Sequence, residues 1–139
     1  MNDPYNLRRF IEAQDPVFEA VCAELRSGRK TGHWMWFIFP QIAGLGRSAT
    51  AERYAISSRP EAEAYSRHPI LGPRLIQCTR LVNALEGRSI AQIPGHPDDL
   101  KFRSSMTLFA HACGDNPVFA EAIGKYFGGE FDRLTLERL

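Results

Sequence analysis

The chain has 139 residues, with 17 lysines and arginines against 16 aspartates and glutamates, so its formal net charge is only +1. This balance argues against a chain-wide attraction to nucleic acid or to an anionic membrane, and we expect neither as a partner. The length suits one domain, residues 1–139, which can bury enough apolar surface to fold without disulfides or metals.

Cysteine usage and the termini indicate a cytoplasmic protein. The three cysteines, Cys22, Cys78 and Cys113, are odd in number and form no CxxC pair, which is typical of reduced thiols. The N-terminus shows no signal-peptide pattern, and no apolar run reaches the roughly 20 residues that span a bilayer. The four histidines are widely separated and no HExxH motif occurs, so we expect no metal and no cofactor.

Proline and glycine mark the predicted helices in the first half of the chain. Asp3-Pro4 and Asp15-Pro16 each indicate a helix start, and the second of these helices ends at Gly28. A capping-box pattern at 58–61 opens a short helix that ends at His68-Pro69.

The sequence predicts three helices that together cover most of the second half of the chain. Apolar residues recur every three or four positions from Pro73 to Gly87, from Asp98 or Asp99 to Gly114, and from Asn116-Pro117 to Gly128. A last amphipathic turn at 134–139 follows Asp132. The prediction is a mainly α, single compact multi-helix domain with orthogonal helix packing around an aromatic core segment.

That aromatic segment is the run WMWFIF at 34–39, which holds both tryptophans. Each large ring removes ~150–250 Å² from water when buried, so the run lies in the core or lines a pocket. It forms a short buried helix or turn, or alternatively a buried strand. Lys30, His33 and Gln41 frame it, and an imidazole beside indoles suits acid–base chemistry, although a histidine satisfied at the edge of the core is commoner.

The stretch GLGRS at 44–48 follows directly. Glycines permit close approach of a ligand to the backbone, and Arg47 can pair with phosphate or carboxylate, which favours an anion site. The alternative is a plain turn in which Ser48 caps the next helix.

A third polar cluster occupies 98–106. On a helix Asp99 and Arg103 can pair on one surface, while Lys101 and Ser105 share another, which allows a serine–lysine arrangement. The alternative is a solvated first turn followed by small residues that allow close helix packing; otherwise Ser104 and Ser105 face the aromatic cleft.

Several stretches together resemble the bacterial domain-of-unknown-function family 1810: GHWMWFIFPQ (32–41), GLGRS (44–48), YAI (54–56), EAEAY (61–65), HPILGPRL (68–75) and KFRSSMTLF (101–109). The similarity covers nearly the whole chain and implies a small, mainly α-helical cytosolic protein without an established activity. Some members carry the label calpastatin-like. We do not transfer it, because this chain shows neither the repeats nor the disorder expected of a calpain inhibitor.

We expect a cleft for an anionic, ring-containing small molecule such as a nucleotide or sugar phosphate, because rings stack on indoles and anions pair with cationic side chains. If chemistry occurs, His33 is the candidate catalytic residue. The candidate binding residues are Lys30, Trp34, Trp36, Gln41, Arg47, Ser48, Lys101 and Ser105. The alternative is a non-enzymatic helical protein-interaction module, in which the aromatics are core and the charges are solvated. Neither catalysis nor the oligomeric state follows from the sequence.

Overall fold

A computed structural model describes residues 3–139. In this part of the chain there are nine helices and no strand, apart from an isolated parallel bridge between Ile42 and Ile56, so the prediction of a mainly α fold is confirmed. None of these helices has the length and hydropathy needed to cross a bilayer. The helices are α1 (Arg8–Gln14), α2 (Phe18–Ser27), α3 (Met35–Ile38), α4 (Ala49–Arg53), α5 (Arg59–Arg67), α6 (Leu71–Asn83), α7 (Asp98–Ala112), α8 (Val118–Phe127) and α9 (Arg133–Leu136).

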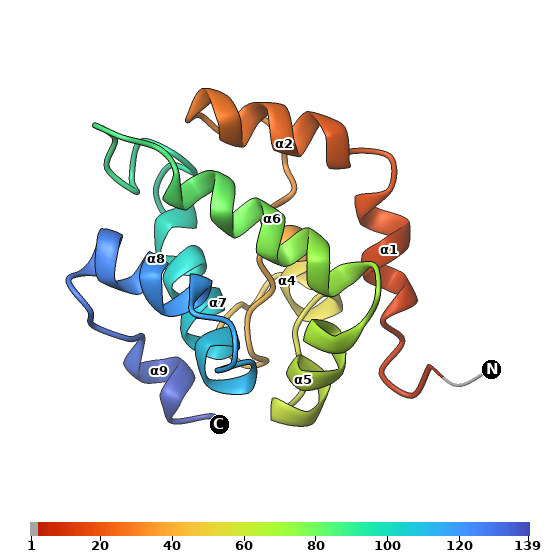
Figure 1. Ribbon diagram of the computed structural model, residues 1–139. Helices are drawn as coiled ribbons and strands as arrows, with labels where there is room; N and C mark the ends of the chain where they lie inside the picture. The colour runs from red at the N-terminus through yellow and green to blue at the C-terminus, as the bar shows by residue number, and fades with distance from the viewer. Residues whose placement is uncertain (1–2) are drawn as a thin grey trace.

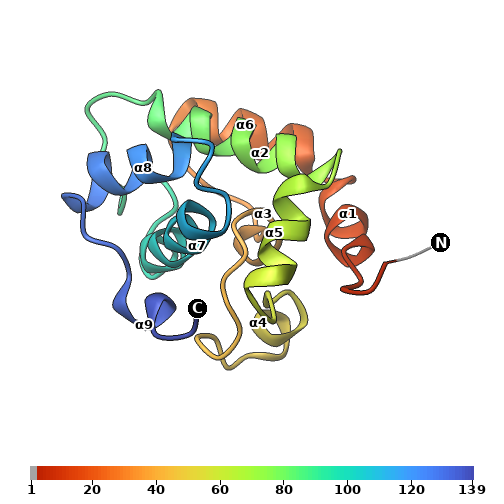
Figure 2. The same cartoon turned by 60° about the horizontal axis from the view of Figure 1, so that its bottom comes forward.

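Helix α7 is the centre of the arrangement, because α5, α8 and α9 all pack against it. Helices α2 and α6 run alongside each other and lie crosswise to α7 (Figures 1 and 2). The short α3 contacts α1 on the inner side. The loop after α3 and the C-terminal α9 therefore both come close to the first half of α7.

Buried aromatic rings connect the helices through the core. Phe10 of α1 meets Tyr65 of α5 edge-on, with ring centres 5.1 Å apart, and Tyr65 in turn lies 5.4 Å from Phe109 of α7. A second contact joins Phe39 to Phe102 at 5.0 Å. Such ring pairs add about 0.5–1.5 kcal/mol beyond the burial of their area. The aromatic segment is thus part of the core, as expected.

Local capping signals place several helix ends where the sequence predicts them. Gly28 and Gly128 end α2 and α8 in the left-handed conformation, with φ of 78° and 62°. Ser58 caps α5 by accepting a hydrogen bond from the Glu61 amide at 3.5 Å. Ser48 caps α4 by accepting from the amide of Ala51 at 3.0 Å, which is the plain-turn interpretation of that stretch.

Three helix starts differ from prediction by a few residues. The carboxylate of Asp3 accepts hydrogen bonds from the amides of Leu7 and Arg8 at 2.8 and 3.1 Å, so α1 begins at Arg8 rather than at Pro4. Asp15 pairs with Arg74 at 2.8 Å instead of capping α2. Helix α6 begins at Leu71, two residues before the proline that indicated its start.

Candidate functional site

Trp34 is a structural residue, because its ring is only 2% exposed. Its Nε1 donates to Glu24 Oε1 at 2.9 Å, and the same oxygen accepts from the amides of Thr31 and Gly32 at 2.7 and 2.8 Å. Burial of the Glu24 carboxyl acts to raise its pKa, but these hydrogen bonds outweigh it, and the pKa lies below its ordinary value. Glu24 therefore fastens the loop before α3 to α2.

Two lysines and a half-buried indole lie next to this loop. The carboxylate of Asp98 pairs with both Lys30 and Lys101, each at 3.0 Å, and the three side chains are 18%, 10% and 27% exposed in that order. The Lys101 ammonium lies 5.1 Å from the ring centre of Trp36, and that of Lys30 lies 5.3 Å from the ring centre of Trp34. The two lysine ammonium groups thus share one carboxylate, and each of them lies over the ring of a tryptophan.

A cleft of about 310 Å³ opens beside Lys101, between the loop after α3, the first half of α7 and the start of α9. This volume is at the lower end of small-molecule sites. Its wall combines one cation, one carboxylate, an amide, a hydroxyl and several apolar groups. The lining residues are Gln41, Leu45, Gly46, Pro97, Leu100, Lys101, Ser104, Asp132 and Leu134.

The polar floor of the cleft is fixed by the start of α9. Asp132 Oδ2 accepts hydrogen bonds from the Thr135 amide at 3.1 Å and from Ser104 Oγ at 3.2 Å. Ser104 Oγ is also 3.1 Å from the Leu100 carbonyl, so its single proton is shared between two acceptors. Ser104 and Lys101 lie about one turn apart on α7, which brings both to the same side of the helix.

The structure brings together some of the candidate residues. Gln41 and Lys101 line the cleft, and Lys30 and Trp36 join Lys101 through the Asp98 ion pairs and the ring contact. Trp34, by contrast, faces the core.

The other candidates lie elsewhere. His33 and Arg47 are exposed, and neither lines the cleft. Ser48 is the cap of α4. Ser105 is fully buried, and its Oγ has no hydrogen-bond partner in the described part of the chain, so it does not share a surface with Lys101.

Asp98 and Asp132 take part in the site but are absent from the candidate residues, whereas Ser104, which one alternative interpretation directs to a cleft, lines the cleft beside Lys101. The sequence predicts Asp98 or Asp99 as a helix cap and a last amphipathic turn after Asp132. In the structure α7 begins at Asp98 itself, and Asp132 caps α9. No local pattern indicates that the start of α9 lies against α7, which is what turns Asp132 into a cleft residue.

Possible metal ligands and thiols are arranged as follows in residues 3–139. No three His, Cys, Asp or Glu side chains there are grouped so that they could hold a metal ion. Cys22 and Cys78 are buried free thiols, and burial raises the pKa of Cys78 well above its usual range, which disfavours the reactive thiolate.

Comparisons place this architecture in a family. A family model described as "Protein of unknown function (DUF1810)" matches residues 4–139. The crystal structure of the conserved hypothetical protein Rv1873 from Mycobacterium tuberculosis is similar over 99% of this chain and 98% of that chain, with 58% sequence identity and a TM-score of 0.97. No curated protein matches. The chain therefore belongs to the DUF1810 family, the same family that its sequence stretches resemble.

Proposed function

We propose that the cleft binds a small anionic molecule with a ring or another flat apolar group, such as a nucleotide or a sugar phosphate. Lys101 carries the proposal. Its side chain is 27% exposed, lines the cleft and lies 5.1 Å from the ring centre of the half-buried Trp36. A cation at the mouth of a cleft can pair with an anionic group while an apolar ring packs against the leucines that line the same cleft.

The cations in and beside the cleft support an anionic ligand. Two lysines share the single carboxylate of Asp98, and Arg47 adds a further cation next to the lining residue Gly46. Asp132 opposes an anion, but its Oδ2 is already occupied by protein donors. Lys101 and Asp132 are the charged residues of the lining, and the two further cations, Lys30 and Arg47, lie outside it.

The apolar side of the cleft supports a ligand with a ring. Leu100 and Leu134 are 52% and 55% exposed, and Leu45 lies half-buried beside them. Covering such side chains gains about 25 cal/mol per Å² of apolar surface removed from water. Binding alone is proposed, because the candidate catalytic residue His33 does not line the cleft.

Titration with nucleotides and sugar phosphates, followed by tryptophan fluorescence, tests the proposal. A change on ligand binding reports mainly on Trp36, which lies beside Lys101, because Trp34 is shielded from solvent. We expect Lys101→Met to weaken binding by about tenfold or more, since a charge-assisted contact is lost. Lys125→Met on α8 is the matched control and should bind normally. A silent panel, with calorimetry also showing no heat, would refute the proposal.

A second candidate function is a docking surface for a protein partner or for a second copy, and the exposure of Leu100 and Leu134 favours it. Such leucines on a cleft rim are common at protein interfaces. Analytical ultracentrifugation across a concentration series tests self-association. A protein that stays monomeric at all concentrations would exclude a second copy as the partner. If the protein does self-associate, the same association by Leu134→Ser would exclude this surface as the interface.

We also propose a cytoplasmic location. Cys22, Cys78 and Cys113 are free thiols, and a reducing compartment preserves them. Fractionation of cells that express the protein would check this, and recovery in an oxidising compartment would contradict it.

A further inference from the structure

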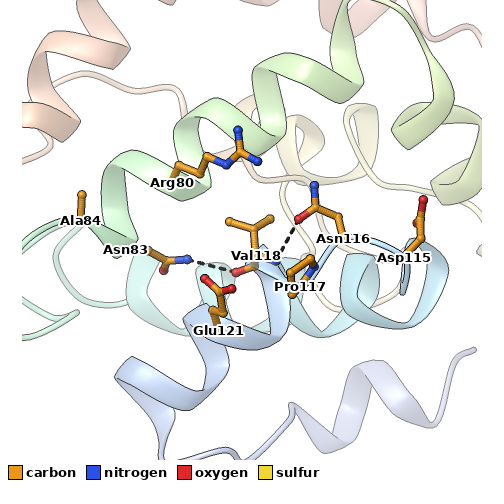
Figure 3. A pocket seen from close by; sticks show the side chains of 8 residues that line it. All are labelled: Arg80, Asn83, Ala84, Asp115, Asn116, Pro117, Val118 and Glu121. Carbon is orange, nitrogen blue, oxygen red and sulfur yellow. Dashed lines mark hydrogen bonds between the residues drawn. The ribbon is translucent and has the colours of Figure 1, made fainter.

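A second hollow lies between the C-terminal part of α6 and the start of α8, and it shares no residue with the cleft beside Lys101 (Figure 3). Its volume is about 410 Å³, which falls in the range of small-molecule sites. It is lined by Arg80, Asn83, Ala84, Asp115, Asn116, Pro117, Val118 and Glu121.

Opposite charges face this hollow without neutralising each other. Arg80 projects from α6 and Glu121 from α8, and in Figure 3 their charged groups lie on opposite sides of Val118. Neither side chain has an ion pair or a side-chain hydrogen bond with any residue between 3 and 139. The structure therefore leaves a separated cation and anion open to a molecule that enters between them.

Asn83 adds an amide to the wall of the hollow. Its Nδ2 donates to the Val118 carbonyl at 3.1 Å, which fixes the orientation of the amide. Its Oδ1 is buried and has no partner in the described residues. Buried acceptors without a donor are uncommon in proteins.

An apolar hollow continues from the charged one along α6. It has a volume of about 690 Å³ and shares Arg80 and Ala84 with the first. Its other walls are Pro73, Ile76, Gln77 and Leu81. The combined surface thus passes from a pair of opposite charges to an aliphatic face, with Arg80 at the junction.

We propose that this surface binds a free α-amino acid with an aliphatic side chain, such as leucine. The carboxylate of the ligand pairs with the guanidinium of Arg80, which offers a two-pronged donor set. Its ammonium pairs with Glu121. Its side chain lies against Ile76 and Leu81. The proposal is independent of the one made for the cleft.

The charges of the walls argue for a zwitterion over a simple ion. A purely anionic ligand would meet the carboxylates of Asp115 and Glu121, and a purely cationic ligand would meet Arg80. Only a molecule that carries both charges, separated by a short distance, is attracted by both walls.

Isothermal titration calorimetry with three related ligands tests this directly. Leucine carries both charges, isopentylamine lacks the carboxylate, and 4-methylpentanoate lacks the ammonium. We expect leucine to bind. Each of the other two ligands should have an affinity at least about tenfold lower, since each loses one charge-assisted contact. Glycine should also bind more weakly, because it leaves Ile76 and Leu81 uncovered.

Variants assign the binding to these residues. Arg80→Gln and Glu121→Gln should each weaken leucine binding about tenfold or more, and both sites are exposed, so the fold should persist. Arg88→Gln and Glu19→Gln, exposed charges outside the hollow, should bind leucine normally. Absence of any leucine binding overturns the proposal. So does equal binding of isopentylamine, 4-methylpentanoate or glycine, or equal binding by Arg80→Gln.

Discussion

A nearly buried ion pair between α1 and α5 makes the sharpest test of how this fold is stabilised. Arg9 Nη2 donates to Glu61 Oε2 at 2.9 Å, and the two side chains are 14% and 3% exposed. Glu61 Oε1 accepts from the amide and the hydroxyl of Ser57 at 2.9 and 2.7 Å. The remaining donors of the guanidinium contact the backbone carbonyls of Tyr5, Asn6, Arg53 and Ala55.

Glu61→Ala removes the only carboxylate in this group and leaves the guanidinium of Arg9 without a counter-charge. Breaking a buried pair on one side costs about 3–5 kcal/mol, a large share of the ~5–15 kcal/mol that stabilises a typical domain. We therefore expect urea unfolding, followed by circular dichroism, to have its midpoint at a clearly lower urea concentration, with an unchanged dependence of the unfolding free energy on urea. Glu12→Ala is the control: its pair with Arg8 is 67% and 77% exposed, and its removal should cost about 0–1 kcal/mol.

The double variant Arg9→Met with Glu61→Leu separates loss of pairing from loss of packing. It leaves no unpaired charge and keeps apolar volume, so it should be less destabilised than Glu61→Ala alone. The reasoning is refuted if the unfolding free energy of Glu61→Ala lies within about 1 kcal/mol of that of the wild type. It is also refuted if the stability lost by the double variant equals the sum of the losses of Arg9→Met and Glu61→Leu measured singly.

Three further predictions concern stability. Folding lowers the pKa of Glu24, so the stability that its carboxylate contributes is present above the unfolded pKa and is lost as pH falls through the folded pKa. The difference in unfolding free energy between wild type and Glu24→Gln should therefore narrow below about pH 4, and a constant difference would contradict this. Phe102→Ala removes a ring that is 1% exposed and should cost about 3–5 kcal/mol by urea unfolding, and a loss under 1 kcal/mol would contradict the packing. A Cβ on Gly72 would lie 2.2 Å from the Ser66 carbonyl oxygen, so Gly72→Ala should lower the melting temperature. Gly124 in α8 has open space around it, so Gly124→Ala should raise the melting temperature slightly, and a higher melting temperature for Gly72→Ala than for Gly124→Ala would refute both expectations.

The helix ends were predictable because their signals are local. Gly28 and Gly128 take the left-handed conformation within the turn that they close, and Ser48 and Ser58 accept bonds from amides three residues on. Such interactions need nothing from the rest of the chain. Where a residue had a stronger distant partner, the local signal failed: Asp15 pairs with Arg74 and does not cap α2.

The two tryptophans show why the site was harder to predict than the fold. The run at 34–39 contains no polar residue, so its pattern does not reveal which ring faces inward. Only packing decides that Trp34 is held in the core by Glu24 while Trp36 stays half-buried beside Lys101.

Composition, spacing and capping residues by themselves determined a mainly α fold and the positions of most of its helices, because helix formation depends on residues a few positions apart. The tertiary structure alone decided that Gln41, Lys101 and Asp132 line one cleft. Gln41 and Asp132 are 91 positions apart in the chain, and side chains so distant meet only through the packing of α7 and α9. No short-range pattern records that contact, since it depends on the buried faces of whole helices.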